Sequence, residues 1–244
     1  MRHAIWITTL ALMGATNVAT AGWSGIGKAG LVMASGNTDT ETGNASLNLA
    51  LERGLWTHTI DLSGLYAATD GDKTAERWEI RERSDYRFRP KTFLFVGGRY
   101  ENDEFSGFDY QATTSLGIGH YFRESENTNL VATAGVGYKF SETSDVFDAT
   151  GTLLQPSDKQ NEVVFRATAD LDHGLTASTR LIAKSAVESG SSNTFIDASL
   201  GLQVKMSDRL ALSATYGIRH NTDVPTGFKK TDKLTTLNLV YEFN

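Results

Sequence analysis

The residues best suited to chemistry in this chain form a ladder of charges between Arg77 and Arg87. Because side chains of a β-strand alternate between its two faces, every second residue here shares one face, with neighbours about 6.8 Å apart. The ladder comprises Arg77, Glu79, Arg81, Arg83, Asp85 and Arg87. It could form a basic constriction that favours anions. Buried charges are normally paired, however, so we favour a wall neutralised by acids on other strands, namely Asp61, Asp170, Asp197 and Glu242.

Residues that could support catalysis do not converge in the sequence. Ser115 and His120 fall on opposite faces of one expected strand, because they are five residues apart, an odd number. A His–Asp pair would require His220 to meet a loop acid such as Asp103, and the sequence leaves that open. The other histidines of the mature chain, His58 and His173, form no pair with the spacing of metal ligands. We therefore predict no catalytic residues and no metal site.

A glycine motif near the start also invites a chemical interpretation. Gly25-x-Gly27-x-x-Gly30 matches the dinucleotide-binding fingerprint, which requires a strand before it and a helix after it. Here a strand pattern runs through the motif, so we interpret the glycines as small residues on a crowded first strand. We predict no cofactor.

The ladder belongs to a chain that reads as strands throughout. In residues 234–243, Leu237, Leu239, Tyr241 and Phe243 share one face and mostly polar residues share the other, a pattern typical of a transmembrane β-barrel. Eleven earlier segments alternate similarly, although the phase of residues 92–101 is ambiguous. The expected strands are 23–35, 43–53, 56–68, 77–88, 92–101, 110–122, 129–140, 161–171, 175–184, 194–205, 210–219 and 234–243.

The connections between these segments predict the topology. Short turns are expected at 53–54, 89–91, 123–127, 172–174 and 207–208, and they alternate strictly with connections at 36–42, 69–76, 102–109, 141–160, 185–193 and 220–233, which are mostly longer. Bacterial barrels have short periplasmic turns and longer outer loops. Aromatic residues gather at strand ends, as the two membrane interfaces require. We therefore predict an all-β fold, a twelve-stranded antiparallel transmembrane β-barrel; Glu82 alone falls on its lipid face, where a bulge or an interfacial position would lower its cost.

Composition and the first residues fit an exported barrel. The chain has 244 residues, no cysteine and a net charge of −6, which excludes a disulfide framework and argues against nucleic acid as a partner. Arg2 and His3 precede an apolar stretch, and Ala19-Thr20-Ala21 resembles a cleavage site. We predict a signal peptide at 1–21 and a barrel domain at 22–244.

The expected outer loops are rich in acidic residues. A solvated surface is the favoured interpretation, because no loop has the spacing of an EF-hand. Weak binding of divalent cations by clustered carboxylates, or contact with lipopolysaccharide, is the alternative.

Several short pieces carry a family resemblance. They are Trp23-Ser24-Gly25, the stretch from Ser35 to Thr40, the stretch from Asp103 to Asp109, Gly-x-Gly-Tyr138 and Tyr241-x-Phe243. Over essentially its whole mature length the chain resembles the salt-induced outer-membrane protein family, a domain-of-unknown-function family of Gram-negative bacteria. The loop residues that carry the resemblance are Gly36, Asn37, Thr38, Asp103, Phe105, Gly107 and Asp109. The resemblance implies an outer-membrane barrel without an established activity.

The same resemblance implies that Tyr241 and Phe243 form the signal that the barrel-assembly machinery reads. The chain departs from the family pattern because it ends on Asn244 rather than on the aromatic residue. Other implied partners are outer-membrane lipids and lipopolysaccharide, and we expect a monomer.

The strand number bears on function. Eight strands leave an interior filled by side chains and sixteen leave an open channel, so in a barrel of twelve the lumen side chains decide. The alternation assigns eleven basic residues to the lumen (Lys28, Arg77, Arg81, Arg83, Arg87, Lys139, Arg166, Arg180, Lys184, Lys205 and Arg219) and seven acidic ones (Glu52, Asp61, Glu79, Asp85, Asp170, Asp197 and Glu242). We predict a narrow pore with a slight preference for anions, or a structural, stress-related barrel.

Three further possibilities bear on this prediction. The connection at 141–160 is long enough to fold inward and plug the lumen. The chain could instead be a lipase- or protease-like outer-membrane enzyme. A secreted, soluble ligand-binding barrel of the lipocalin type would place its apolar residues inside, and the alternating outer aromatics speak against it.

Overall fold

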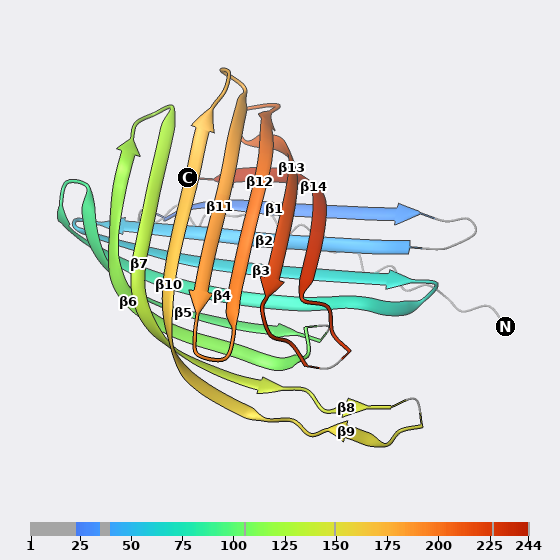
Figure 1. Cartoon of the computed structure of the whole chain (residues 1–244). Coiled ribbons are helices and arrows are strands. Elements are labelled where there is room, and N and C mark those ends of the chain that lie inside the picture. Colours follow the sequence, from blue (N-terminus) through green and yellow to red (C-terminus); the bar gives the residue numbers. More distant parts are fainter. Residues whose placement is uncertain (1–22, 35–39, 105, 149, 226, 244) are drawn as a thin grey trace.

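The computed structural model describes residues 23–34, 40–104, 106–148, 150–225 and 227–243, and its regular elements are strands (Figure 1). The signal peptide predicted for 1–21 lies outside these residues. The strands are β1 (Trp23–Ala34), β2 (Thr40–Arg53), β3 (Trp56–Thr69), β4 (Asp72–Arg89), β5 (Thr92–Asp103), β6 (Phe108–Glu124), β7 (Thr128–Thr143), β8 (Val146–Phe147), β9 (Leu153–Gln155), β10 (Lys159–Gly174), β11 (Thr179–Ser189), β12 (Thr194–Lys205), β13 (Leu210–Asn221) and β14 (Thr231–Phe243).

Twelve of these strands close into an antiparallel barrel in the order β1-β14-β13-β12-β11-β10-β7-β6-β5-β4-β3-β2. The near and far walls cross in Figure 1, as expected for the tilted strands of a barrel. The predicted fold class is confirmed. Among the described residues, none forms a helix with the length and apolarity that crossing a membrane requires.

Strand alternation places most apolar side chains outside and most polar side chains inside. The first part of β5 is an exception with apolar residues on both faces, because Leu94 and Val96 are 51% and 55% exposed outside whereas Phe93 and Phe95 are 1% and 7% exposed and point inward. The phase that was ambiguous in the sequence is therefore fixed by packing. Glycines on β6 make room for the inward rings: a Cβ on Gly119 would lie 2.1 Å from a carbon of Phe93.

The two ends of the barrel differ in their connections, although less regularly than expected. The turn end carries residues 54–55, 90–91, 125–127, 175–178 and 206–209, and the loop end carries 70–71, 104–107, 144–158, 190–193 and 222–230. Strict alternation of short and long connections is wrong. β3 and β4 are joined by Asp70 and Gly71 alone, with φ of 52° and 86°, the left-handed conformation that a two-residue hairpin needs. β4 thus begins at Asp72, five residues earlier than predicted. The added residues are mostly polar and lengthen the β3–β4 hairpin at its loop end.

The turn expected at residues 172–174 is also misplaced. β10 continues to Gly174, and Asp172 lies on the inner face, where its Oδ1 is 2.6 Å from Nε of Arg180. The ion pair and the ladder between β10 and β11 together hold these residues in the strand, and the turn follows at 175–178.

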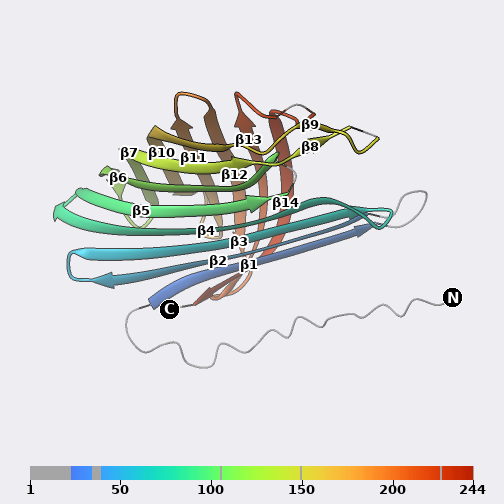
Figure 2. The same ribbon diagram turned by 90° about the horizontal axis from the view of Figure 1, so that it is seen from below.

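The connection between β7 and β10 contains a hairpin that the sequence did not predict. β8 and β9 form a separate two-stranded sheet, which projects beyond the loop end in Figures 1 and 2. Asp148 closes the hairpin, since its Oδ1 accepts hydrogen bonds from the Thr150 hydroxyl (2.7 Å) and the Thr152 amide (2.8 Å). These hydrogen bonds lower the pKa of Asp148, and the bond from the Thr150 hydroxyl has the largest effect. The idea that this connection folds inward as a plug is wrong, because its own pairing directs it away from the lumen.

Aromatic rings on the outer face cluster toward both ends. Near the loop end, Trp78 and Tyr100 stack with ring centroids 5.1 Å apart, and near the turn end Trp56 and Tyr86 lie 5.0 Å apart. Glu82 points outward between these clusters, as its strand phase predicted, and accepts a hydrogen bond from Ser84 (2.7 Å). No bulge lies at Glu82, because its register with Ile60 and Gly98 is regular.

Candidate functional site

The charged ladder lies on the inner face of β4 and is largely paired within that strand. Nε of Arg81 is 2.8 Å from Oε1 of Glu79, and Nε of Arg83 is 2.9 Å from Oδ1 of Asp85. Neighbouring inward residues on one strand are close enough for long arginine side chains to fold back onto them. Arg81 and Arg83 are therefore paired within β4, whereas Nη1 of Arg87 lies 3.0 Å from Oε1 of Glu124 on β6.

Arg99 on β5 forms the centre of the charged lumen, and the sequence assignment missed it. Its side chain is 3% exposed, with Nε 2.6 Å from Oε2 of Glu79 and Nη2 2.8 Å from Oε2 of Glu101. The residue was missed because the phase of β5 was ambiguous, with aromatic residues on both faces. A buried guanidinium with carboxylates on two sides is the arrangement that burial of charge requires.

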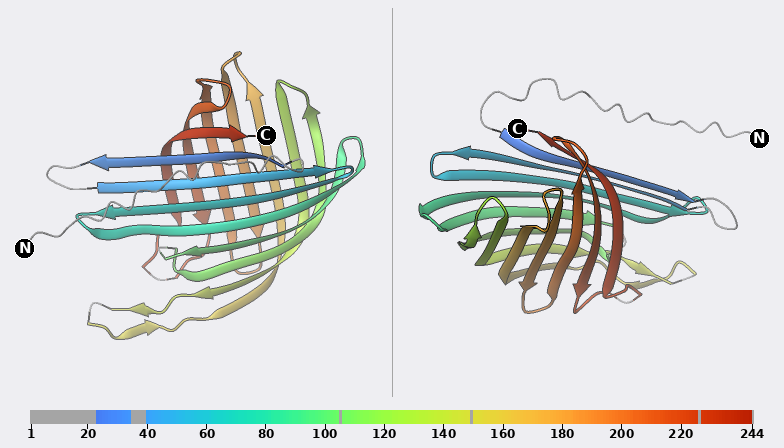
Figure 3. Two further views of the ribbon diagram at one scale, coloured as in Figure 1. Left: turned by 180° about the vertical axis from the view of Figure 1, so that it is seen from behind. Right: turned by 90° about the horizontal axis from the view of Figure 1, so that it is seen from above.

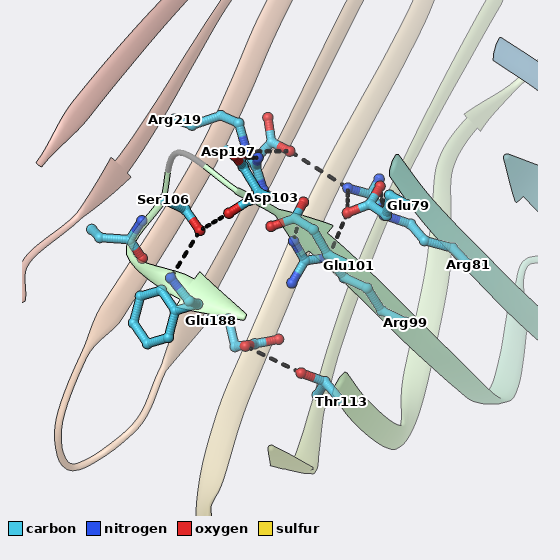
Figure 4. Close-up of polar contacts among 12 residues, drawn as sticks. Glu79, Arg81, Arg99, Glu101, Asp103, Ser106, Thr113, Glu188, Asp197 and Arg219 are labelled. Carbon is cyan, nitrogen blue, oxygen red and sulfur yellow. Dashed lines mark hydrogen bonds and ion pairs between the residues drawn. The ribbon is translucent and has the colours of Figure 1, made fainter. Parts of the chain in front are cut away.

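The network crosses the lumen from wall to wall. Nη2 of Arg219 on β13 lies 2.6 Å from Oε2 of Glu101 on β5, and Nη1 lies 3.5 Å from Oδ2 of Asp103 (Figure 4). β5 and β13 are six strands apart in either direction around the closed barrel, so they face each other. A second contact joins the opposite strands β4 and β12, where Nη2 of Arg81 is 3.5 Å from Oδ2 of Asp197. Ion pairs therefore join the two walls at this level.

An aromatic ring lies between the two central arginines. The guanidinium carbons of Arg99 and Arg219 lie 5.1 Å and 4.9 Å from the centroid of Phe195, which is 6% exposed. Cation–π contacts of this kind stabilise charge where water is scarce. Phe195 thus contributes to the network from β12. It points inward because its neighbour in sequence, Ile196, points outward and successive residues of a strand alternate between the two faces.

Glu188 on β11 is another buried acid, and it lies beside the network. Its carboxylate lies 3.9 Å from Nζ of Lys139 and 3.9 Å from Nη1 of Arg166, and it accepts a hydrogen bond from the Thr113 hydroxyl at 3.3 Å (Figure 4). The sequence assignment placed Glu188 in a loop, because β11 was expected to end at residue 184. The strand in fact continues to Ser189.

The newly assigned inward charges change the balance of the lumen. They include Arg99, Glu101, Asp103, Asp172, Glu188 and also Glu162, the register partner of the inward Lys139. Five of these six are acids, so they offset the excess of basic groups counted from the sequence. Any preference for anions therefore depends on where the charges stand, since their sum is nearly balanced.

The loop between β5 and β6 packs over this network at the loop end. Gly107 has a φ of 80°, and a Cβ there would lie 2.9 Å from the Phe228 ring and 3.0 Å from Pro225. Its carbonyl accepts a hydrogen bond from the Ser144 amide at 3.0 Å, and the Ser144 hydroxyl donates to Asp109 at 2.6 Å. The family-like residues Asp103, Gly107 and Asp109 thus build a cover that joins three loops. Phe105 and the motif residues Gly36, Asn37 and Thr38 lie outside the described residues.

A cavity of about 320 Å³ lies on the turn side of the network. The basic residues lining it are Arg81, Arg83, Arg166 and Lys184, and acids and hydroxyl residues complete the wall, among them Asp61, Asp170, Asp197, Ser115 and Thr168. A space of this size and polarity suits a small polar solute with hydrogen-bonding groups.

The arrangements considered for catalysis are not assembled in the described part of the chain. Ser115 is buried on the inner face, whereas His120 lies on the outer face and contacts the Thr92 hydroxyl at 3.0 Å. Nδ1 of His220 is 2.8 Å from the Thr231 hydroxyl, while Asp103 contacts Arg219. The expected absence of catalysis stays a prediction.

One outer-face cluster combines a serine, a histidine and an acid. The Ser84 hydroxyl lies 2.7 Å from both Nδ1 of His58 and Oε1 of Glu82. Nucleophilic catalysis needs the histidine between the serine and the acid. Here the serine stands in the middle, so this cluster lacks the order of a triad.

Solved structures with the same architecture are outer-membrane barrels. The NanC porin matches with a TM-score of 0.51 at 9% identity, over 91% of this chain and 99% of that chain. The translocator domain of the autotransporter NalP from Neisseria meningitidis matches with a TM-score of 0.47 at 13% identity, over 91% and 87%. The β domain of the Bordetella autotransporter BrkA gives 0.47 at 13%, over 92% and 100%. At such identities the likeness shows the fold alone.

Comparison by sequence points to one family. No curated protein matches the chain. A family model described as "Protein of unknown function, DUF481" matches residues 27–243, which is nearly the whole barrel. The chain therefore belongs to the DUF481 family of proteins of unknown function.

Proposed function

We propose that this protein is an outer-membrane barrel that acts as a narrow pore for small polar solutes, closed at rest by the cross-lumen network. The observation that carries the proposal is the contact of 2.6 Å between Arg219 and Glu101 on opposite walls. Where side chains from opposite walls meet, a solute can pass only if the ion pairs separate or if it fits beside them. The cavity on the turn side then serves as a chamber below a closed constriction.

The proposal places the turn end in the periplasm and the loop end outside the cell. Exposed outward leucines and aromatic rings toward both ends support a lipid-facing surface. Residues 1–21 would direct export, and the barrel would contact outer-membrane lipids and lipopolysaccharide as a monomer. We expect the protein in the outer-membrane fraction, with faster gel mobility before boiling than after. A soluble protein without a heat shift would exclude this placement.

The last strand is the proposed signal for the barrel-assembly machinery. Tyr241 and Phe243 lie on the outer face. The Phe243 ring packs against Gly25 of β1, where a Cβ would lie only 2.3 Å from a ring carbon. Phe243→Ala should reduce the assembled fraction and leave export unchanged, whereas a substitution of the outward Leu237 to Ala should assemble normally. Normal assembly of Phe243→Ala would reject the signal.

A weak preference for anions follows from the cavity rather than from total charge. Lys184 is exposed toward the cavity, and its register partner Asp170 is on the neighbouring strand. In a planar bilayer with a salt gradient we expect a reversal potential on the anion side, reduced by Lys184→Gln. The matched control is Lys159→Gln at the loop end, where the side chain is 71% exposed. Cation selectivity of the unaltered protein would contradict the assignment.

A permanently closed structural barrel is the second candidate, and the filled network favours it. In that case the unaltered protein and variants of Arg219 would conduct equally little. The salt-induced character that the sequence resemblance implies belongs with this stress-related role. It predicts that the abundance of the protein rises when cells are moved to high salt, and an unchanged abundance would remove it.

A further inference from the structure

The pairing of β1 with β14 closes the barrel and is called the seam below. It is shorter than the other strand pairings of the barrel. β1 and β14 are paired at five positions, from Gly25 with Phe243 to Ala29 with Leu239, whereas β1 and β2 are paired at twelve. β14 follows β13 from Thr231 onward and turns alongside β1 only near its end (Figures 1 and 3). Among the described residues, the loop-end part of β1 has a register with β2 alone. The loop-end parts of β1 and β14 thus diverge.

An amide pair marks the point where the pairing stops. Nδ2 of Asn44 on β2 donates a hydrogen bond of 2.7 Å to Oδ1 of Asn238 on β14, passing over Gly30 of the intervening β1. Only glycine fits beneath this clasp, because a Cβ on Gly30 would lie 2.4 Å from Oδ1 of Asn238. Asn238 in turn donates to the Thr236 hydroxyl at 3.1 Å. The clasp holds the seam at the last point before the strands diverge.

The two lips of the diverging seam have opposite character. On the outer face, Leu31 of β1 is 67% exposed and Leu237 of β14 is 65% exposed. On the inner face, Asn44, Asn238 and Thr236 present uncharged amide and hydroxyl groups, and the nearest charge farther along β14, Asp232, is the register partner of Arg219 on β13. A molecule that matches both faces of the diverging edges has an acyl chain against the outer leucines and a hydroxyl-rich, uncharged head against the inner polar groups.

We propose that the seam opens sideways above the Asn44–Asn238 clasp and admits an amphiphile whose uncharged polar head enters the lumen while its chain remains in the bilayer. This inference rests on the proposed outer-membrane placement. It adds a lateral route to the axial one. An occupant is expected in the seam because unpaired strand edges that face lipid are unfavourable unless another group covers them. The amphiphile is the covering group.

The chain has no cysteine, so single labels report cleanly. We compare bimane attached to Thr42→Cys, inward and beside the diverging part, with bimane at Ser46→Cys, inward and beside the closed part. The quencher is an alkyl maltoside that carries bromine on the chain carbons next to its head group, the part of the chain that enters the seam with the head, and it is exchanged for the unbrominated detergent. Bimane at Leu62→Cys on the outer face controls for immersion of the barrel wall, and the gel heat shift checks folding of each variant.

The proposal predicts several-fold stronger quenching at position 42 than at position 46, increased further by Asn238→Leu, which removes the clasp. Equal, weak quenching at 42 and 46, with strong quenching at Leu62→Cys, would overturn the lateral opening alone. Absence of quenching at Leu62→Cys would overturn the membrane placement instead.

Disulfide formation gives a second measurement that does not depend on a probe. Gly27→Cys with Tyr241→Cys lies in the paired part of the seam, where strand partners come within reach of a disulfide. Leu31→Cys with Leu237→Cys lies where that register would continue if the seam were closed. We expect rapid oxidation of the first pair and little of the second. Equally rapid oxidation of both pairs would show a closed seam and refute the proposal.

Discussion

The two halves of the lumen are filled by different means. Toward the loop end, Arg99, Glu101 and Arg219 join opposite walls through ion pairs. Toward the turn end, Phe93 and Phe95 pack with Val131 on one wall, and a polar cavity of about 320 Å³ remains beside them. Charge therefore connects the walls toward the loop end, and apolar packing thickens a single wall beside the cavity.

This difference separates stability from gating. Aromatic packing stabilises the barrel whether or not a solute is present, because burial of apolar surface needs no particular partner. An ion pair can exchange its partner for a solute charge or for water at modest net cost, since its formation and its desolvation nearly cancel. The charged half is thus suited to a closure that opens.

Breaking the centre of the charged half should have the largest effect. Arg99→Leu leaves Glu79 and Glu101 buried without their shared cation, and breaking such a buried pair typically costs about 3–5 kcal/mol. We expect that loss in the free energy of unfolding, measured by urea titration in detergent micelles.

The control for Arg99→Leu is Arg180→Leu. Arg180 contacts Asp172 at 2.6 Å, but the side chains of this pair are 37% and 43% exposed, so the loss should be about 1 kcal/mol or less. Equal losses in the two variants would show that Arg99 is not the centre of the network.

Breaking the apolar half should have a smaller effect and leave closure unchanged. Phe93→Ala removes a ring that is 1% exposed, and we expect a loss of about 3 kcal/mol, at the low end for such a truncation because the adjacent cavity can admit water. Conductance should stay at the level of the unaltered protein. If Phe93→Ala instead opened the pore, gating and stability would not be separated between the halves.

The smallest effect is expected in the β8–β9 hairpin, outside the lumen. Because hydrogen bonds lower the pKa of Asp148 in the folded state, the bonds favour the hairpin at neutral pH and are lost as the pH falls below the usual aspartate value of about 4. Anisotropy of a label at Leu154→Cys should fall with acidification. Asp148→Asn should lower the anisotropy at neutral pH and remove most of its pH dependence. A hairpin whose mobility does not change with pH would show that Asp148 does not hold it.

Much of the barrel could be predicted from local alternation alone. Leu237, Leu239 and Tyr241 face outward as their spacing indicates, and the same rule put the ladder of β4 on the inner face. Alternation failed where apolar residues occupy both faces, as at Phe93 and Leu94 on β5. The inward face there was decided by Gly119 and its neighbours on β6, which are distant in sequence.

The cross-lumen contacts could not be predicted, because they depend on which strands face each other in the closed barrel. Glu101 and Arg219 are 118 positions apart, and no local pattern relates them. The ends of strands were equally uncertain, since polar residues such as Lys73 and Asp172 continue a hairpin without altering its pairing. These extensions brought Glu188 and Asp172 into the lumen and reduced the predicted excess of basic charge.

The most direct test of closure by the network is conductance of the unaltered protein and of Arg219→Gln in planar bilayers at one salt concentration. Arg219→Gln removes the cation that Glu101 and Asp103 share across the lumen and keeps a polar, although shorter, side chain. We predict rare, small openings for the unaltered protein and a several-fold larger mean conductance for the variant. A steady open current from the unaltered protein, unchanged by Arg219→Gln, would contradict closure by ion pairs.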